Sequence, residues 1–268
     1  MGQQRQLSAE TRAVIEELVP EAAKARRVFI FTGAGVSAES GIPTFRDAQT
    51  GLWAKYDPVM LASIDGFRKD PANVWKWYDE RRQTMSQCMP NAGHTAITEW
   101  QRMLAPVQGR LDLATQNIDD LHRIAGTEQL IELHGNIWEV RPLGAGFADA
   151  FRLMDCPLSE HPPRAADGST LRPNVVWFGE MLDESVLNHA FHCAMKADLA
   201  LSIGTSSLVY PAAALPFVAR EHGATLVEIN PERTELTAAA DYVLQEPSAL
   251  ALPALVEGIR SILPGNPA

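Results

Sequence analysis

Short apolar runs recur along the chain, each bounded by glycine, proline or polar residues. Runs of this kind that are rich in β-branched and aromatic residues indicate buried strands. They predict strands at 27–31, 111–115, 130–133, 175–178, 199–203, 225–229 and 242–244. Apolar residues at helical spacing predict a helix over 8–25, with Ser8 as its N-cap, and another over 93–104. Helical stretches separate several strands, which predicts an α/β fold with a doubly wound parallel sheet.

Two segments depart from this pattern. Residues 48–90 are rich in Trp, Tyr, Arg and Lys, and we expect them to form a helical insertion. Residues 141–173 contain repeated Gly and Pro, which interrupt regular elements. The sequence therefore predicts a smaller inserted module beside the sheet.

Polar residues and glycines follow five of the predicted strands. Because the carboxyl ends of parallel strands meet at one edge of a sheet, we expect these residues to lie close together. Glycines bring backbone N–H groups up to a phosphate, and hydroxyl and amide groups suit ribose and carboxamide. The sequence thus predicts a dinucleotide site that includes Gly33, Ala34, Gly35, Gln116, Asn117, Ile118, Asp119, His134, Gly135, Gly204, Thr205, Ser206 and Asn230.

The turn after the first strand carries the glycines, followed by Ser37, Ser40 and Gly41. Taken alone, the glycines fit an ordinary tight β-to-α turn equally well, since Ala38 replaces the last glycine of the usual G-x-G-x-x-G. The following Ile42-Pro43-x-Phe45-Arg46-Asp47 combines a rigid Pro, an aromatic ring and opposite charges. This combination predicts a loop that closes over a ligand.

Composition narrows the class of protein. The 268 residues are 46% hydrophobic and 21% charged, as in a globular protein with a sizeable core. A formal charge of −10 disfavours nucleic acid as a partner. No apolar run reaches the roughly 18–20 residues of a membrane helix, and the N-terminus lacks the apolar centre of a signal peptide. Three cysteines without paired spacing favour a cytoplasmic protein over a disulfide framework.

Four stretches together resemble the motifs of the sirtuins, the NAD-dependent protein deacylases. They are GAGVSAESGIPTFRD at 33–47, QNID at 116–119, LHG at 133–135 and PNVVWFGE at 173–180. The resemblance implies that NAD is consumed as a co-substrate. The acyl oxygen of a modified lysine attacks C1′ of the nicotinamide ribose, nicotinamide leaves, and the acyl group ends on ADP-ribose.

The resemblance also implies residue roles. His134 would act as general base on a ribose hydroxyl, and Asn117 would position the ribose and carboxamide together with Asp119. Arg46 and Asp47 would order the loop over the cofactor. The expected cofactor contacts are Gly33, Ala34, Gly35, Ser37, Ile42, Phe45, Arg46, Gln116, Asn117, Asp119, Gly204, Thr205, Ser206 and Asn230. Without the resemblance, Asn117 and Asp119 also fit a helix cap after a strand, and His134 a structural histidine.

Residues 173–180 resemble the peptide-binding strand of the family, opposite an edge supplied by 206–211. An extended substrate would add to it by backbone hydrogen bonds, with aromatic side chains walling the lysine channel. The expected substrate contacts are Val175, Trp177, Phe178, Gly179 and Glu180. The alternative is a buried strand with aromatic core residues. By the same resemblance, the Rossmann-like NAD-binding domain comprises 20–47, 91–137 and 174–260, and the small module comprises 48–90 and 138–173.

Tyr78 and Arg81 bear on the choice of acyl group. On a helix they are three residues apart and face the same way. A Tyr-x-x-Arg pair occupies this place in the sirtuin subgroup that removes negatively charged acyl groups, where the guanidinium binds a carboxylate. We therefore expect activity on succinyl- or malonyl-lysine beside acetyl-lysine. The alternative is an amphipathic helix with a solvated basic face.

The sequence departs from the family at the structural zinc. Sirtuins usually carry two Cys-x-x-Cys pairs, but Pro142 and Ala145 stand at the first and Arg164 and Asp167 at the second. A thiolate zinc site needs four N or S ligands, which Cys156 and the nearby His161 do not provide. We expect no structural zinc, and in its place an apolar cluster of Phe147, Phe151, Leu153 and Met154.

Three functions fit these motifs. The first is deacylation of lysine in acylated proteins or peptides, with neither nucleic acid nor membrane as partner. The second is protein mono-ADP-ribosyl transfer, which would not depend on an acyl group. The third is an NAD-binding sensor without turnover. The intact His134 and Asn117 favour the deacylase.

Overall fold

The structure is a computed structural model that describes residues 6–44 and 58–263, so the predictions for Phe45, Arg46 and Asp47 lie outside it. Six parallel strands form the main sheet in the order β3-β2-β1-β7-β8-β9. They are β1 (Arg27–Thr32), β2 (Arg110–Thr115), β3 (Leu130–Glu132), β7 (Leu199–Ile203), β8 (Thr225–Ile229) and β9 (Tyr242–Leu244). The strands predicted for this sheet are confirmed within a residue at each end.

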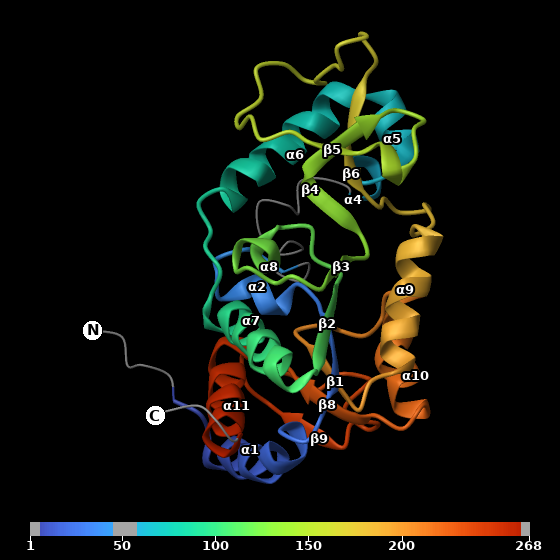
Figure 1. Cartoon of the computed structure of the whole chain (residues 1–268). Helices are drawn as coiled ribbons and strands as arrows, with labels where there is room; N and C mark the ends of the chain where they lie inside the picture. Colours follow the sequence, from blue (N-terminus) through green and yellow to red (C-terminus); the bar gives the residue numbers. More distant parts are fainter. Residues whose placement is uncertain (1–5, 45–57, 264–268) are drawn as a thin grey trace, which may run out of the picture.

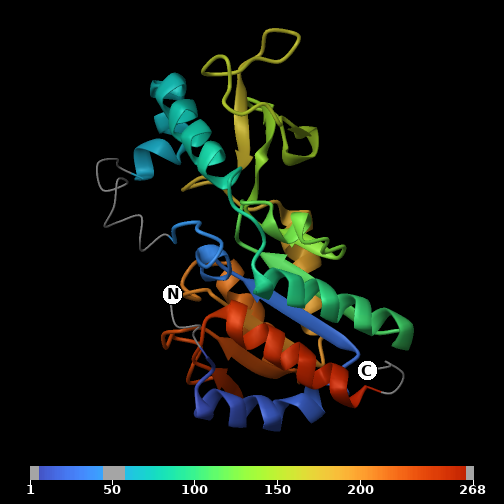
Figure 2. The ribbon, with the colours of Figure 1, turned by 90° about the vertical axis from the view of Figure 1, so that its left-hand side faces the viewer.

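Alternation along β1 determines which side chains face which helices. Val28 and Ile30 share one core with α1 (Ala9–Ala22), α7 (Ala92–Leu104) and α11 (Ser248–Ile262). Phe29 and Phe31 share a second core with α9 (Glu184–Met195) and α10 (Leu215–Glu221). Helices therefore cover both faces of the sheet, and the doubly wound fold is confirmed (Figures 1 and 2). Ser8 caps α1 as predicted, its Oγ accepting the Thr11 N–H at 3.1 Å.

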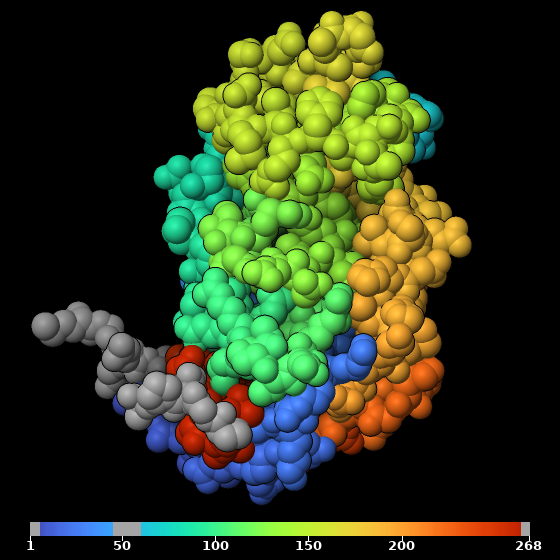
Figure 3. All heavy atoms as spheres, viewed as in Figure 1, coloured from blue at the N-terminus to red at the C-terminus, as the bar shows by residue number. Residues whose placement is uncertain are grey.

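A second, antiparallel sheet has the order β5-β4-β6 and belongs to the small module. Its strands are β4 (Gly135–Pro142), β5 (Phe151–Arg152) and β6 (Leu171–Val175), and its helices are α4 (Pro58–Leu61), α5 (Ile64–Lys69) and α6 (Pro71–Met85). Four tryptophans, Trp75, Trp77, Trp138 and Trp177, lie in the core between sheet and helices. The module forms the upper lobe in Figures 1 and 3.

Shorter elements complete the chain. They are α2 (Gly35–Ala38), α8 (Leu121–Ile124), and the single turns η2 (Ala105–Val107), η3 (Phe147–Asp149) and η4 (Ala212–Ala214). Within the ranges that the structure describes, no helix combines the length and apolar character needed to cross a membrane.

The strand predicted at 175–178 is wrong in its position. β6 ends at Val175 and pairs with β4 of the small sheet, not with the main sheet. After Val175 the backbone N–H groups donate to two different segments of the chain. The Val176 N–H donates to the His134 carbonyl, and the Phe178 N–H donates to the Ala62 carbonyl. Trp177 lies in the small-module core. The apolar run at 175–178 therefore indicates burial and not a continuous strand.

The apolar cluster predicted in place of zinc is also wrong, since Phe151 is 45% and Met154 59% exposed. Polar groups of α6 hold this segment instead. Asp79 accepts the Leu158 N–H at 3.1 Å and lies 3.2 Å from His161 Nε2. Arg82 donates to the Leu153 carbonyl, and its guanidinium lies 4.9 Å from the Trp138 ring centroid. We call Asp79, Arg82 and the groups they hold the α6 clamp.

Candidate cofactor and substrate site

Three glycines bring the loop after β1 against the loop after β7. The Gly33 N–H donates to the Ile203 carbonyl at 3.0 Å, and the Gly35 N–H donates to the Gly204 carbonyl at 2.8 Å. A Cβ added at Gly35 would lie 2.7 Å from Gly204 Cα, too close for a real side chain. Glycine is therefore required for this contact, which also leaves the backbone around Ala34 bare of bulky side chains.

Side chains from three strand ends meet at Thr205. Gln116 Nε2 donates to Thr205 Oγ1 at 2.9 Å, and Asn230 Nδ2 donates to the Thr205 carbonyl at 3.0 Å. Ser206 follows and is exposed. The residues that the topology predicted at one edge, after β2, β7 and β8, are thus in contact, and they offer the hydroxyl and amide groups that suit a ribose.

Ser37, Asn117 and Asp119 form one hydrogen-bonded unit. Ser37 Oγ donates to Asp119 Oδ2 at 2.7 Å and accepts from Asn117 Nδ2 at 3.1 Å. His94 Nδ1 accepts the Asn91 N–H at 3.2 Å, so the ring proton is on Nε2, which lies 3.4 Å from Ser37 Oγ. Burial raises the pKa of Asp119, and the Ser37 hydrogen bond lowers it by less. Ile42 donates its N–H to the Ser37 carbonyl and packs in the small-module core.

His134 is placed to accept a proton. Its Nδ1 lies 3.0 Å from the Gln116 carbonyl oxygen. Because a carbonyl only accepts, Nδ1 carries the ring proton, and Nε2 of the neutral imidazole carries none. Burial lowers the pKa of His134, and the hydrogen bond to Gln116 raises it by less. The ring is therefore neutral near physiological pH, with Nε2 available as a base.

Sequence reasoning missed a buried polar group next to these residues. Thr32 Oγ1 donates to Thr115 Oγ1 at 2.8 Å and lies 3.0 Å from His122 Nε2. The His122 and His94 rings are 4.8 Å apart between centroids, and both side chains are buried. The sequence did carry signals for them, namely His122 within the QNID-x-LH stretch and the Asn91-x-x-His94 capping box at the start of α7.

The predicted peptide-binding residues divide into a buried and an exposed set. Val175 and Trp177 are each 2% exposed, whereas Phe178 is 52% exposed and Gly179 is exposed as well. The Glu180 carboxylate accepts the Trp177 N–H at 2.9 Å and pairs with Arg172 at 2.7 Å. Only the Phe178–Gly179 part is therefore open to a peptide. The opposing segment is also open, with Leu208, Val209 and Tyr210 all more than half exposed.

Tyr78 and Arg81 lie on α6 beside the small-module core. Tyr78 is 3% exposed, and its hydroxyl accepts the indole N–H of Trp177 at 2.8 Å. The Arg81 guanidinium lies 4.7 Å from the Trp77 ring centroid. Burial lowers the pKa of Arg81, while the nearby Tyr78 and Asp119 raise it. Arg81 therefore places its charge between α6 and the QNID residues of the cofactor side.

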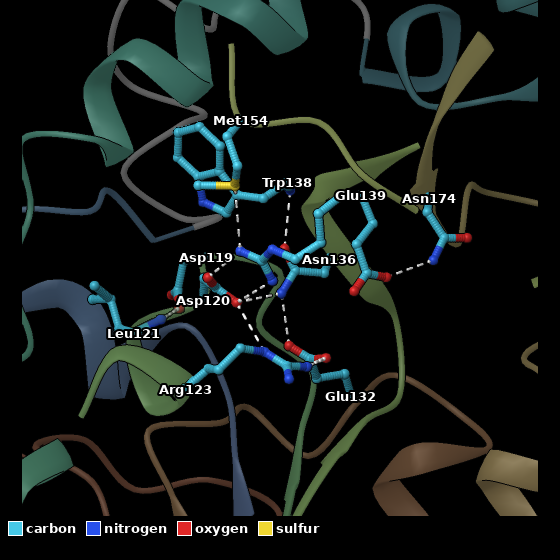
Figure 4. A network of polar contacts seen from close by, with 11 residues as sticks. Asp119, Asp120, Leu121, Arg123, Glu132, Asn136, Trp138, Glu139, Met154 and Asn174 are labelled. Atoms are coloured by element: carbon cyan, nitrogen blue, oxygen red, sulfur yellow. Dashed lines mark hydrogen bonds and ion pairs between the residues drawn. The ribbon is translucent and has the colours of Figure 1, made fainter. Parts of the chain in front are cut away.

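A polar network joins the QNID stretch to the small sheet (Figure 4). Asp120 follows Asp119 and accepts from Arg152 of β5 at 2.6 Å and from Asn136 of β4 at 2.6 Å. Arg123 of α8 also pairs with Asp120, at 3.2 Å. The network therefore connects α8 and the segment that follows β2 to β4 and β5 of the small sheet.

The residues at the expected zinc position do not fit a structural zinc. His161 bonds to Asp79, and the charges of Arg82 and Asp79 act on the Cys156 thiol, whose pKa is raised by burial. In the described part of the chain, no three His, Cys, Asp or Glu side chains converge as a metal would need. The absence of structural zinc stays a prediction.

Comparison with known proteins gives consistent matches. The sequence profile of the Sir2 family matches residues 33–211. NAD-dependent protein deacylase 1 of Pseudomonas aeruginosa is 46% identical over 262 residues, which cover 95% of this chain and 100% of that protein. A solved complex of a Sir2 homologue with NAD is 39% identical, with a TM-score of 0.84 and 97% of each chain covered. A Sir2 protein solved with a myristoylated histone peptide is 30% identical, with a TM-score of 0.74, over 93% of this chain and 98% of that one.

Proposed function

Because this chain belongs to the Sir2 family, we propose that it is an NAD-dependent protein lysine deacylase. Its relatives at 41–46% identity are named NAD-dependent protein deacylase. Its substrates are then acylated lysines of proteins or peptides. The three cysteines are free, which suits work in the reducing cytoplasm.

The observation that carries this proposal is the hydrogen bond between His134 Nδ1 and the Gln116 carbonyl. It leaves Nε2 as the proton acceptor, so His134 can take a proton from a ribose hydroxyl. Bound NAD would supply that hydroxyl and the ribose carbon to which the acyl oxygen bonds. Asn117, Ser37 and Asp119 would hold the carboxamide and ribose, because their polar groups are already oriented by mutual hydrogen bonds.

The remaining predicted contacts fit the rest of the dinucleotide. The N–H groups of Gly33 and Gly35 bond to the Ile203 and Gly204 carbonyls, and the absence of side chains on these two glycines leaves the backbone at Ala34 open to the phosphates. The ribose and adenosine would contact the polar residues that follow β2, β7 and β8, namely Gln116, Thr205, Ser206 and Asn230. An extended peptide would lie along the exposed Phe178–Gly179 segment, facing Leu208–Tyr210, and add by backbone hydrogen bonds.

We further propose that the enzyme accepts acyl groups that end in a carboxylate, such as succinyl and malonyl. Tyr78 and Arg81 lie one helical turn apart on α6, and both Tyr78 and Asp119 raise the pKa of Arg81, which burial lowers. A guanidinium in a desolvated channel binds a carboxylate through paired hydrogen bonds, which an acetyl group cannot form.

Nicotinamide release with matched acetyl- and succinyl-lysine peptides tests both parts. Arg81→Met should lower the ratio of succinyl to acetyl kcat/KM about tenfold or more, since hydrogen bonds to charged groups contribute about 1.5–3 kcal/mol. Lys76→Met is the matched control, because Lys76 is an exposed cation on the same helix. It should leave the ratio at the wild-type value.

Other outcomes would replace the proposal. NAD binding without nicotinamide release from any acyl-lysine peptide would indicate the sensor. Nicotinamide release that does not depend on an acyl group would indicate ADP-ribosyl transfer. Equal effects of Arg81→Met on both peptides would remove the acyl preference and keep the deacylase.

A further inference from the structure

The geometry points to Trp177 as a positioning residue that orients the Tyr78 hydroxyl toward the carboxylate of the acyl group. The indole Nε1 of Trp177 lies 2.8 Å from the Tyr78 hydroxyl oxygen, and both side chains are buried. This inference rests on the proposed preference for carboxylate-bearing acyl groups, and it assigns to Trp177 a role apart from walling the lysine channel.

Donor and acceptor chemistry gives the hydrogen bond a direction. An indole N–H is only a donor, so the Tyr78 oxygen accepts and its own hydrogen points elsewhere. Burial raises the pKa of Tyr78 to about 12, and Arg81 lowers it by less. The hydroxyl therefore keeps its hydrogen at any assay pH. Among the described residues Tyr78 donates to no partner, so this hydrogen remains available for a substrate oxygen.

Two contacts to the ring and one to the backbone hold Trp177, whose indole sets this direction. The Arg172 guanidinium lies 3.6 Å from the Trp177 ring centroid, and the Phe67 ring packs at a centroid distance of 5.2 Å. Glu180 accepts the Trp177 backbone N–H at 2.9 Å and also pairs with Arg172. Rotation of the Trp177 indole would therefore break its contacts with the Arg172 guanidinium, the Phe67 ring and the Tyr78 hydroxyl.

The position of Trp177 in the chain couples two parts of the substrate site. The exposed Phe178–Gly179 segment, where the peptide would add, directly follows the residue that holds Tyr78. Glu180 follows this segment, and its carboxylate accepts a hydrogen bond from the Arg172 guanidinium. Through these contacts the segment that would hold the peptide also determines the orientation of a group that would select its acyl chain.

The test compares Trp177→Phe with Trp75→Phe by nicotinamide release from succinyl- and acetyl-lysine peptides. Trp75 is a matched control, because its indole is equally buried in the same core and donates to the Leu171 carbonyl at 2.7 Å. Trp177→Phe should lower the succinyl-to-acetyl kcat/KM ratio about threefold to tenfold, mainly through the KM for the succinyl peptide. Trp75→Phe should leave the ratio unchanged.

Two further variants make the result decisive. Tyr78→Phe should lower the ratio similarly. The Tyr78→Phe/Trp177→Phe double variant should lower it no further, since both substitutions remove the same hydrogen bond from the Tyr78 hydroxyl to the acyl carboxylate. In ¹⁵N-labelled protein, Tyr78→Phe should shift the Trp177 indole N–H resonance without any peptide present.

The outcomes separate this inference from the function on which it rests. If Trp177→Phe matches Trp75→Phe while Tyr78→Phe and Arg81→Met lower the ratio, the role of Trp177 is overturned and the acyl preference stands. If the two effects add in the double variant, the positioning role is also overturned. If the wild type does not turn over the succinyl peptide, the acyl preference fails and this inference fails with it.

Discussion

At the residue scale, single hydrogen bonds determine what the polar side chains of this site can do. The Gln116 carbonyl selects the tautomer of His134, and the Asn91 N–H selects that of His94. The protonation state of each Nε2 follows: it carries no proton in His134 and carries the ring proton in His94. His134 Nε2 can therefore accept a proton, whereas His94 Nε2 faces Ser37 Oγ as a donor.

The lowered pKa of His134 predicts the pH dependence of turnover. Because burial favours the neutral ring, the pKa of His134 lies below the ordinary histidine pKa of 6.5, and the ring remains neutral at pH 6.5. The acid limb of kcat/KM for deacetylation should therefore have its midpoint below pH 6.5. His134→Ala should abolish turnover, whereas His222→Ala, at an exposed position, should leave the profile unchanged. A midpoint above pH 6.5 would contradict the assignment.

The close contact between the two loops predicts a large effect of Gly204→Ala. Gly204 has φ +60°, and an added Cβ would lie 2.5 Å from the Val36 N atom. We expect loss of NAD binding and a free energy of unfolding lowered by more than the 1–2 kcal/mol or so that a left-handed conformation costs alone. Gly144→Ala is the control, since Gly144 has φ +93° and nothing within 4 Å. Equal losses in both variants, by calorimetry and NAD titration, would show that strain alone is responsible.

At the scale of elements, α6 has different functions on its different faces. Tyr78 and Arg81 lie toward Trp177 and the cofactor side, while Asp79 and Arg82 hold residues 153–161. The segment that would carry zinc in other sirtuins is thus fastened to the helix that carries the proposed acyl-recognition pair. Loosening the clamp should therefore disturb acyl recognition as well as stability.

Asp79→Ala tests the α6 clamp. It leaves the Leu158 N–H and His161 without their buried acceptor, which should cost about 1–3 kcal/mol of unfolding free energy. The succinyl-to-acetyl activity ratio should fall as well, because α6 would lose its anchor. Glu80→Ala removes an exposed carboxylate from the same helix and should change neither quantity. Denaturant unfolding and peptide turnover would measure both, and an Asp79→Ala variant as stable as Glu80→Ala would refute the clamp.

The α6 clamp also predicts insensitivity to metal removal. Dialysis against EDTA should leave the thermal midpoint and nicotinamide release unchanged, because polar contacts to α6 take the place of thiolate ligands. Elemental analysis should find less than one zinc per chain. A stoichiometric, tightly held zinc would contradict the prediction.

The limits of sequence-based prediction follow from the same elements. Buried parallel strands carry continuous apolar runs, so β1, β2, β7 and β8 and the polar residues after them were predictable. The apolar run at 175–178 has the same composition but serves a core made by other segments, which local pattern does not reveal. Likewise Asp79 and Arg82 have the sequence pattern of a solvated helix face. Their burial depends on residues 153–161, about 70–80 positions along the chain.

At the scale of the whole molecule, the proposed site draws on both sheets. The proposed dinucleotide contacts lie at the edge of the main sheet, whereas Tyr78 and Trp177 pack in the core beside the small sheet and Arg81 lies on the same helix as Tyr78. Their relative position must be held to within the reach of a hydrogen bond for NAD and acyl-lysine to meet. Figure 4 shows where this is done: Asp120 is linked to Arg123 on α8 and to Asn136 on β4.

Asp120→Asn should therefore weaken the connection in a pH-dependent way. Burial alone would raise the pKa of Asp120, but hydrogen bonds from Arg152 and Asn136 and the charge of Arg123 outweigh it and hold the pKa below 3.8. A carboxylate with a lowered folded-state pKa stabilises the protein above its unfolded value, and this stabilisation is lost as pH falls through the folded value. Asparagine tolerates the φ of +75° at this position, so the backbone is retained.

Urea unfolding at several pH values measures this contribution. Asp120→Asn should be less stable than the wild type by about 1.5–3 kcal/mol at pH 7. The difference should shrink below about pH 3.8, where the wild-type carboxylate is protonated in the unfolded and then in the folded state. Asp65→Asn removes an exposed carboxylate from α5 and should show no such dependence. If the difference persists unchanged into acid, Asp120 acts through packing and not through its charge, and another contact must hold the two sheets together.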